Sequence, residues 1–148
     1  MTYQHTQRGH IDTILYVGMF AMLIVALAWH AAPGAFYGFA LLAGIFFVLA
    51  LAFAQLTVRD AGDQLVVQYG PLPLFRKRIR YADITAARGG RSHWIDGWGI
   101  HYVPGRGWTY NLWGFDCVEL ELGSKKLRIG TDDRANLLAL VESKIDAG

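Results

Sequence analysis

The sequence predicts an α+β membrane protein, in which a transmembrane helical hairpin is followed by a small antiparallel β-sandwich or β-barrel with a C-terminal capping helix. The hairpin is predicted by residues 13–58, where His30 is the only acidic or basic side chain and Pro33-Gly34 makes the only break. The second part is predicted by short alternating segments between glycine-rich turns, which continue from Leu56 almost to the end of the chain.

Each half of this uncharged run is long enough to cross a bilayer as a helix. Residues 13–32 and 35–55 each provide about 20 mostly apolar residues, which at about 1.5 Å per residue span the roughly 30 Å hydrocarbon core. Proline biases the preceding residue away from the helical region, so we expect the chain to turn at Pro33-Gly34. We therefore predict a transmembrane hairpin at residues 13–55.

The positions of the basic residues predict the orientation of the hairpin. The turn contains no Lys or Arg, whereas Arg8 precedes the first helix and all other basic residues follow the second helix. The positive-inside rule therefore places both termini in the cytoplasm, with residues 1–12 as a short segment whose Asp12 caps the first helix. This predicts a multi-pass protein of the cell membrane with a cytoplasmic domain at residues 56–148.

Each predicted helix has a side of small residues that suits close packing in lipid. These are Gly18, Ala21, Ala28 and Ala32 in the first helix, and Ala40, Ala43, Gly44, Ala50 and Ala54 in the second. The opposite side of the second helix faces either lipid or a partner protein, and it carries Leu42, Phe46, Leu49 and Phe53. His30 lies at a helix end without a second ligand nearby, so we interpret it as solvated rather than as a ligand of a pigment or haem.

The predicted strands follow the second helix directly, because no Gly/Ser-rich or Pro-rich linker separates them. The soluble domain is thus expected to lie against the lipid headgroups rather than on a flexible tether. Strand-like patterns occur at residues 56–59, 65–69, 76–84, 99–103, 108–112, 118–122 and 127–129. Gly89-Gly90 is among the turns expected between them.

The end of the chain predicts a β-hairpin and a final helix. Apolar and ionic patterns favour a register that pairs Leu122 with Leu127 and places Glu121 opposite Arg128 on the exposed face. Thr131-Asp132-Asp133 then supplies an N-cap and negative charge for an amphipathic helix. The apolar face of that helix consists of Leu137, Leu138, Val141 and Ile145.

Several motifs resemble those of a family of bacterial membrane proteins with two N-terminal helices and a small pleckstrin-homology-like (PH-like) domain. They are Tyr69-Gly70-Pro71, Gly97-Trp98-Gly99-Ile100, Gly114-Phe115-Asp116 leading into Val118-Glu119-Leu120, and Leu127-Arg128-Ile129-Gly130-Thr131-Asp132. The resemblance covers most of the chain after Leu56. It implies a PH-like fold and a bacterial inner-membrane location, and it brings no catalytic residues with it.

Composition and motifs argue against several classes of function. The formal net charge of +2 does not indicate a nucleic-acid partner, and the single Cys117 excludes an intrachain disulfide. The serines lie in no nucleophile motif, and His93, Asp96 and His101 match no recognised metal-ligand spacing. We therefore predict no enzyme activity, no metal and no cofactor.

One candidate binding feature is a basic strand behind an apolar tip. Phe75 ends the tip Leu72-Pro73-Leu74-Phe75, and the basic residues that follow are Arg76, Lys77, Arg78 and Arg80. Such a segment is attracted to an anionic membrane surface by about 1 kcal/mol per basic residue. A solvated strand with alternating charges explains the pattern equally well, and both interpretations stay open here.

The second candidate feature is a cluster of aromatic residues: Trp94, Trp98, Trp108, Tyr110 and Trp113. This is more than a small domain usually places in its core, and Trp is enriched at interface hot spots. We therefore expect partner contacts at Trp98, Trp108 and Trp113, together with the apolar side of the second helix.

These features lead to a ranked set of functional hypotheses. The favoured hypothesis is a non-enzymatic accessory or adaptor subunit that docks on a larger membrane protein complex. The alternative is a module that binds anionic lipids or senses the membrane, and an enzyme is the weakest hypothesis. The expected partners are membrane lipids and another membrane protein.

Overall fold

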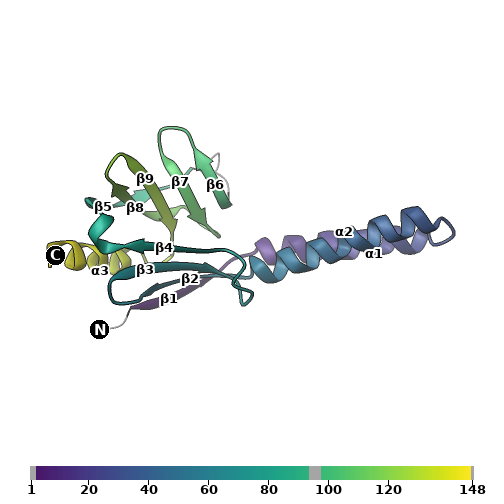
Figure 1. Ribbon diagram of the computed structural model, residues 1–148. Helices are drawn as coiled ribbons and strands as arrows, with labels where there is room; N and C mark the ends of the chain where they lie inside the picture. The colour runs from purple at the N-terminus through teal and green to yellow at the C-terminus, as the bar shows by residue number, and fades with distance from the viewer. Residues whose placement is uncertain (1–2, 94–97, 148) are drawn as a thin grey trace.

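The computed structural model describes residues 3–93 and 98–147, and it has two visibly different parts (Figure 1). A long pair of antiparallel helices extends from one end of a domain that contains two β-sheets and a C-terminal helix. The predicted α+β organisation, with two apolar helices before a β domain, is therefore confirmed.

The hairpin consists of α1 (Ile11–Ala28) and α2 (Pro33–Ala52), both of which are long and apolar enough to cross a membrane. The turn was predicted at Pro33-Gly34, but it lies before Pro33, which is the first residue of α2. A proline fits there, since the first helical N–H needs no partner and φ is already helical. Asp12 is not the N-cap of α1 either: that position is His10, and Asp12 accepts a hydrogen bond from the Thr13 N–H at 2.8 Å.

The two helices pack through a seam that matches the predicted one only in part. Ala43 and Ala50 of α2 are buried as expected, and their counterpart in α1 is Ala26, whereas Ala21 and Ala28 are exposed. Phe46 also lies in the seam, because a Cβ added to Gly18 would meet its ring at 2.8 Å. The expected outer position of Phe46 is therefore wrong.

The first sheet is antiparallel and has the order β1-β2-β3-β4. It consists of β1 (Gln4–Arg8), β2 (Gln55–Asp60), β3 (Gln64–Tyr69) and β4 (Arg76–Arg80). The N-terminal segment, expected only as a short segment before the first helix, thus contains a strand, and β1 pairs along its whole length with the strand that leaves the hairpin. Both ends of the hairpin enter the domain as neighbours in one sheet.

The second sheet has the order β5-β8-β9-β7-β6 and is antiparallel except for the parallel pair β7 and β9. Its strands are β5 (Ala86–Arg91), β6 (Gly99–Val103), β7 (Gly107–Asn111), β8 (Asp116–Leu122) and β9 (Lys125–Gly130). The turn predicted at Gly89-Gly90 is wrong, because both glycines lie inside β5.

The register predicted for the last hairpin is wrong by two residues. Leu122 faces Lys125 across a two-residue turn, and Leu120 rather than Leu122 faces Leu127. Glu119 therefore takes the place expected for Glu121 and pairs with Arg128 at 2.9 Å. A shift of two residues keeps every side chain on its face, which explains why the apolar pattern did not detect the error.

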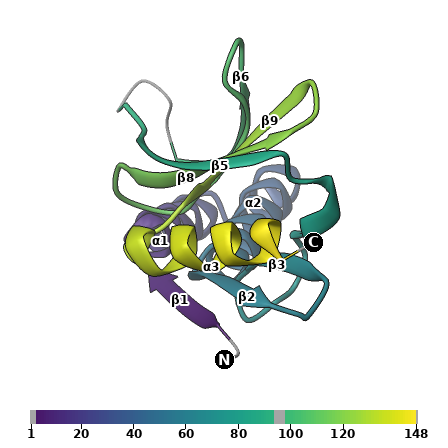
Figure 2. The same ribbon diagram turned by 90° about the vertical axis from the view of Figure 1, so that its left-hand side faces the viewer.

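The core lies between the two sheets and is closed at one end by α3 (Arg134–Asp146), which follows η1 (Tyr81–Asp83) and the strands of the second sheet. Figure 2 shows α3 lying across the opening between β5 and β8 on one side and β2 and β3 on the other. Leu137 and Val141 are fully buried, as the predicted apolar face requires. The helix begins after Asp133 as expected, although that side chain makes no capping hydrogen bond.

Candidate binding surfaces

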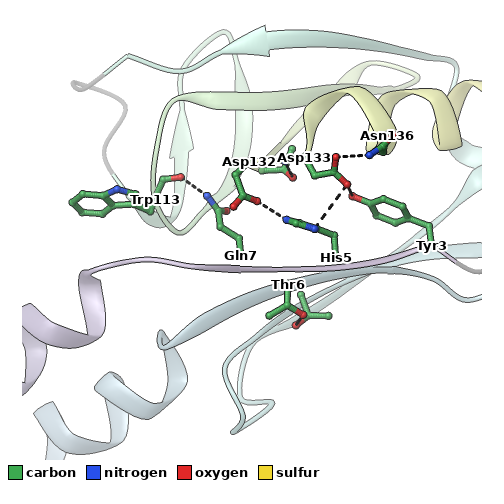
Figure 3. Close-up of polar contacts among 10 residues, drawn as sticks. Tyr3, His5, Thr6, Gln7, Trp113, Asp132, Asp133 and Asn136 are labelled. Atoms are coloured by element: carbon green, nitrogen blue, oxygen red, sulfur yellow. Dashed lines mark hydrogen bonds and ion pairs between the residues drawn. The ribbon is translucent and has the colours of Figure 1, made fainter.

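Side chains of β1 and of Tyr3 just before it attach the N-terminal segment to the start of α3 (Figure 3). Tyr3 Oη donates a hydrogen bond to Asp133 Oδ2 at 3.3 Å, and His5 Nε2 lies 2.5 Å from Asp132 Oδ1. Burial and the neighbouring Asp133 carboxylate raise the pKa of Tyr3 well above its ordinary value, so its hydroxyl stays protonated and donates. Gln7 is buried, and its Nε2 donates to the backbone oxygen of Trp113 at 2.7 Å.

These contacts fix the hairpin to the domain from both sides. β1 is paired with β2 in the first sheet, while its side chains reach the loop before α3 and the loop after β7. Rotation of the hairpin relative to the domain would break both sets of contacts together. The domain is therefore held in a defined orientation at the base of the hairpin.

The base of the hairpin carries an aromatic junction, which we define as Phe53, Tyr69, Phe75, Trp98 and Trp113. Phe53 is the C-cap of α2, and its ring centroid lies 5.2 Å from that of Tyr69 and 5.4 Å from that of Phe75. Tyr69 is buried, and its hydroxyl reaches the backbone oxygens of Gly99 at 3.4 Å and Asn111 at 3.2 Å. This junction connects the end of α2 to both sheets.

Two of the three tryptophans expected to contact a partner belong to this junction. Trp98 stacks on Trp113 at a centroid distance of 4.3 Å, and His10 meets Trp113 edge-on at 5.1 Å. His10 caps the start of α1, so the stack lies where the hairpin enters the domain. Trp94 lies outside the described residues. Trp108 lies elsewhere, on the β6–β7 hairpin, and is 50% exposed.

The structure divides the predicted basic strand into parts with different surroundings. The loop before β4 lies against the end of α2: Phe75 contacts Phe53, while Leu72 and Leu74 are exposed beside it. From this loop β4 runs away from the hairpin (Figure 1). The basic residues therefore lie at increasing distance from the hairpin rather than in one row beside its base.

Alternation along β4 places its basic side chains on both faces of the sheet. Lys77 shares a face with the buried Ile79, whereas Arg76, Arg78 and Arg80 point to the other face. Arg76 Nε donates to Gln68 Oε1 at 3.0 Å, and Arg80 binds Asp83 through two hydrogen bonds at 3.0 and 2.9 Å. Arg76 is the basic residue nearest to the loop at the hairpin base.

A groove of about 510 Å³ separates β4 from the turn ends of the second sheet. It is lined by Lys77, Tyr102, Gly105, Gly107, Trp108, Leu122, Ser124, Lys125, Lys126 and Leu127. Tyr102 and Trp108 meet edge-on at 5.9 Å, and both rings are largely exposed. Three lysines and no acidic residue line this groove, which makes it suitable for a ligand that combines negative charge with an apolar part.

The remaining residues expected to contact a partner lie along α2. Leu42 is 42% exposed, whereas Leu49 is half-buried and Phe46 is in the seam. Phe53 packs in the aromatic junction instead of facing outward. Leu42 is therefore the member of this set with the most surface available for lipid or protein.

Titratable groups do not assemble into a metal centre within residues 3–93 and 98–147, where no group of at least three His, Cys, Asp or Glu side chains occurs. Asp96, one of the residues weighed as a ligand, lies outside the described residues. Burial raises the pKa of the Cys117 thiol, which disfavours the reactive thiolate.

Sequence reasoning missed the groove, although part of the signal was present. Among the binding candidates, the sequence singled out Lys77 and Trp108, but not Lys125, Lys126 or Tyr102. Tyr102 and Trp108 lie beside the lysines of β9 through the parallel pairing of β7 and β9, and Lys77 joins them from the other sheet; local sequence patterns reveal neither relation. No protein-family model matches the sequence, and no curated protein matches it.

Proposed function

We propose that this chain is a membrane-anchored PH-like module of the bacterial inner membrane, and that it acts as an accessory subunit docked on a larger membrane protein complex. The observation that carries the proposal is the pairing of β1 with β2, which locks the domain to both ends of the hairpin. A rigid attachment of this kind is useful where a binding surface must be presented at a fixed height and angle to a neighbour in the membrane. A domain that acts independently of such a neighbour could be joined to the hairpin by a flexible linker.

The exposed surfaces agree with this proposal. The hairpin displays apolar side chains along most of its length, and these suit lipid as well as a neighbouring helix. Trp108 and Tyr102 are exposed on the domain, at a distance from the aromatic junction that holds the hairpin. Exposed aromatic residues of this kind are typical of hot spots in protein interfaces.

Purification of the full chain in a mild detergent tests the proposal. We expect a protein to co-purify in fixed stoichiometry, and we expect Trp108→Ala to reduce its recovery by the equivalent of at least about 2 kcal/mol of binding. Trp98→Ala is the matched control, because Trp98 is similarly exposed but belongs to the aromatic junction. Recovery of lipid without any stoichiometric protein would contradict the accessory-subunit function.

The proposal includes an orientation with both termini in the cytoplasm, based on the absence of Lys and Arg from the turn. A cysteine introduced at Ala32 should react with a membrane-impermeant thiol reagent added to intact cells, and one introduced at Ala147 should not. The native Cys117 is buried and gives little background. The reverse labelling pattern would overturn this orientation.

A second candidate function, binding of anionic lipid, is favoured by the loop before β4. Leu72, Leu74 and Phe75 are exposed at the base of the hairpin, and Arg76 follows them directly. If this function is correct, Arg76→Glu should reduce the amount of anionic lipid retained by the full chain, and added salt should have the same effect. Arg59→Glu is a suitable control, because Arg59 is also exposed but lies in β2. Equal lipid retention by both variants would reject lipid binding at this loop.

A further inference from the structure

The groove continues a row of side chains that begins in the core. The registers of the second sheet place Leu120, Leu127, Trp108 and Tyr102 side by side across β8, β9, β7 and β6. Leu120 and Leu127 are buried, whereas Trp108 is 50% and Tyr102 60% exposed. Neighbours in such a row share a face of the sheet, so an inward-facing surface continues past the point where the first sheet ends.

The first sheet ends at β4, which has an unpaired edge beside this groove. Within the described part of the chain, no strand pairs with the edge of β4 that faces away from β3. The Tyr69 N–H donates to the Phe75 oxygen at 2.9 Å, and alternation from this pair turns the backbone groups of Lys77 toward β3. The N–H and C=O groups of Arg76 and Arg78 therefore point to the free edge, where an added strand would find them.

We propose that an acidic, extended segment of the partner protein binds here, adding a strand to the free edge of β4 and covering Tyr102 and Trp108 with apolar side chains. This inference rests on the accessory-subunit function proposed above and specifies the chemistry of its partner. Side chains alternate along a strand, so the segment carries apolar residues on the groove face and acidic residues opposite Arg76 and Arg78. Lys77, Lys125 and Lys126 add positive charge along the groove.

The positive charge of β4 favours an acidic segment over a second copy of the chain at this edge. Pairing of two β4 edges would bring Arg76, Arg78 and Arg80 of both copies together, and like charges opposite one another destabilise a sheet. The same basic residues that discourage self-association attract an acidic strand. A helix is a poorer fit, because it would leave the backbone groups at the edge of β4 without partners.

Position selects a protein segment over lipid headgroups. Gly99 and Asn111, at one end of β6 and β7, lie by the aromatic junction, whereas the groove is formed around the opposite ends of these strands. The β6–β7 and β8–β9 turns are accordingly set back from the base of the hairpin (Figure 1). The electrostatic field of a charged membrane surface decays over about 8 Å at physiological salt. A membrane surface at the base of the hairpin would therefore attract charges at the groove only weakly.

Binding of synthetic peptides to the full chain in nanodiscs of neutral lipid tests the inference directly. The probe is a fluorescent peptide that alternates glutamate and leucine, and fluorescence anisotropy reports its affinity. We expect saturable binding that weakens with salt, and we expect the double variant Lys77→Glu/Lys126→Glu to weaken it at least about tenfold. Arg59→Glu, outside the groove, should change it little.

Two further peptides separate strand addition from simple charge attraction. N-methylation of alternate residues removes backbone donors but keeps the charge, so this peptide should bind at least about tenfold more weakly. A lysine–leucine peptide should not bind. Equal binding of the N-methylated peptide, or no binding of the acidic peptide to the unmodified chain, would overturn the inference.

Partner recovery distinguishes a failure of this inference from a failure of the proposed function. Retention of a stoichiometric partner by the Lys77→Glu/Lys126→Glu variant would overturn the groove as the docking site and leave the accessory function intact. Loss of that partner together with loss of peptide binding supports the inference. Absence of any partner from the unmodified chain would instead reject the function on which the inference rests.

Discussion

The soluble domain is closed where it meets the hairpin and open at the groove. At the junction, ring contacts, β1 pairing and the close approach of Gly70 to the end of α2 hold the domain to the hairpin, although Trp98 and Phe75 remain partly exposed. At the groove, the inward-facing row of the second sheet ends in two exposed rings, which no strand of the described residues covers. The aromatic residues at the junction serve to hold the fold together, whereas those at the groove remain available for binding.

The largest effect that tests this comparison is expected at Gly70, where the junction is tightest. Its φ is +60°, and an added Cβ would lie 2.4 Å from the Ala52 oxygen and 2.5 Å from the Leu51 oxygen. We expect Gly70→Ala to lower the free energy of unfolding by about 3 kcal/mol or more, from backbone strain and overpacking together. Thermal unfolding of the full chain, followed by circular dichroism, measures this loss.

Gly62→Ala is the matched control for Gly70→Ala. Gly62 also has a positive φ, of +87°, but an added Cβ would meet no atom within 4 Å. Its substitution should therefore cost only about 1–2 kcal/mol for the left-handed conformation. Equal losses at the two glycines would show that close contact with α2 adds nothing to stability.

The next effect compares tryptophans at the two sites. Trp113 is half-buried between Trp98 and His10, and we expect Trp113→Ala to lower the free energy of unfolding by about 2 kcal/mol. Trp108→Ala should cost less than about 1 kcal/mol, because half of that side chain is already exposed. Melting of both variants checks the difference, and a larger loss for Trp108→Ala would make the groove part of the structural core.

The fold could be predicted from sequence wherever a strong pattern was local. The two apolar runs, the strand of residues 65–69 and the final helix were found, because composition and periodicity act over a few neighbouring residues. β1 was missed because its five residues Gln4–Arg8 are all polar or charged. It is a strand because β2 and the start of α3 provide its partners, and these lie far along the chain.

The candidate site shows the same limit. Trp108 was singled out as a member of the aromatic cluster, and the basic strand was recognised from its composition. Their relation was not, because Lys77 reaches the groove only through the arrangement of two sheets. Trp98 and Trp113 were expected at a partner surface, but they stack on each other at the base of the hairpin. Local sequence patterns do not distinguish an aromatic side chain that is exposed for binding from one that packs within the chain.

At the end of the domain opposite the hairpin, the contacts of Asp60 can be tested through the pH dependence of stability. Burial alone would raise the pKa of Asp60, but hydrogen bonds from Lys144, the Gly62 N–H and Tyr81 outweigh it and hold this pKa below its ordinary value. The unfolded chain therefore takes up a proton at higher pH than the folded chain. The free energy of unfolding should decrease as the pH falls through and below about 3.8.

Asp60→Asn tests this assignment. We expect the variant to lose about 1–2 kcal/mol of stability at neutral pH, because a charged acceptor of several hydrogen bonds is removed. Its stability should also fall less steeply than that of the unmodified chain below pH 3.8. Parallel acid curves for the two proteins, measured by chemical denaturation, would show that Asp60 does not contribute to the pH dependence.

The smallest effect is expected from one hydroxyl at each of the two compared sites. Tyr69 Oη is buried between the backbone oxygens of Gly99 and Asn111, so it links the first sheet to the second at the junction. Tyr69→Phe keeps the ring against Phe53 and removes only this link, and we expect a loss of about 1 kcal/mol. Tyr102→Phe at the groove should change stability by less than about 0.5 kcal/mol, since that residue is 60% exposed. Chemical denaturation of the three proteins in the same detergent measures both changes. A loss for Tyr102→Phe that equals the loss for Tyr69→Phe would remove the distinction between a closed junction and an open groove.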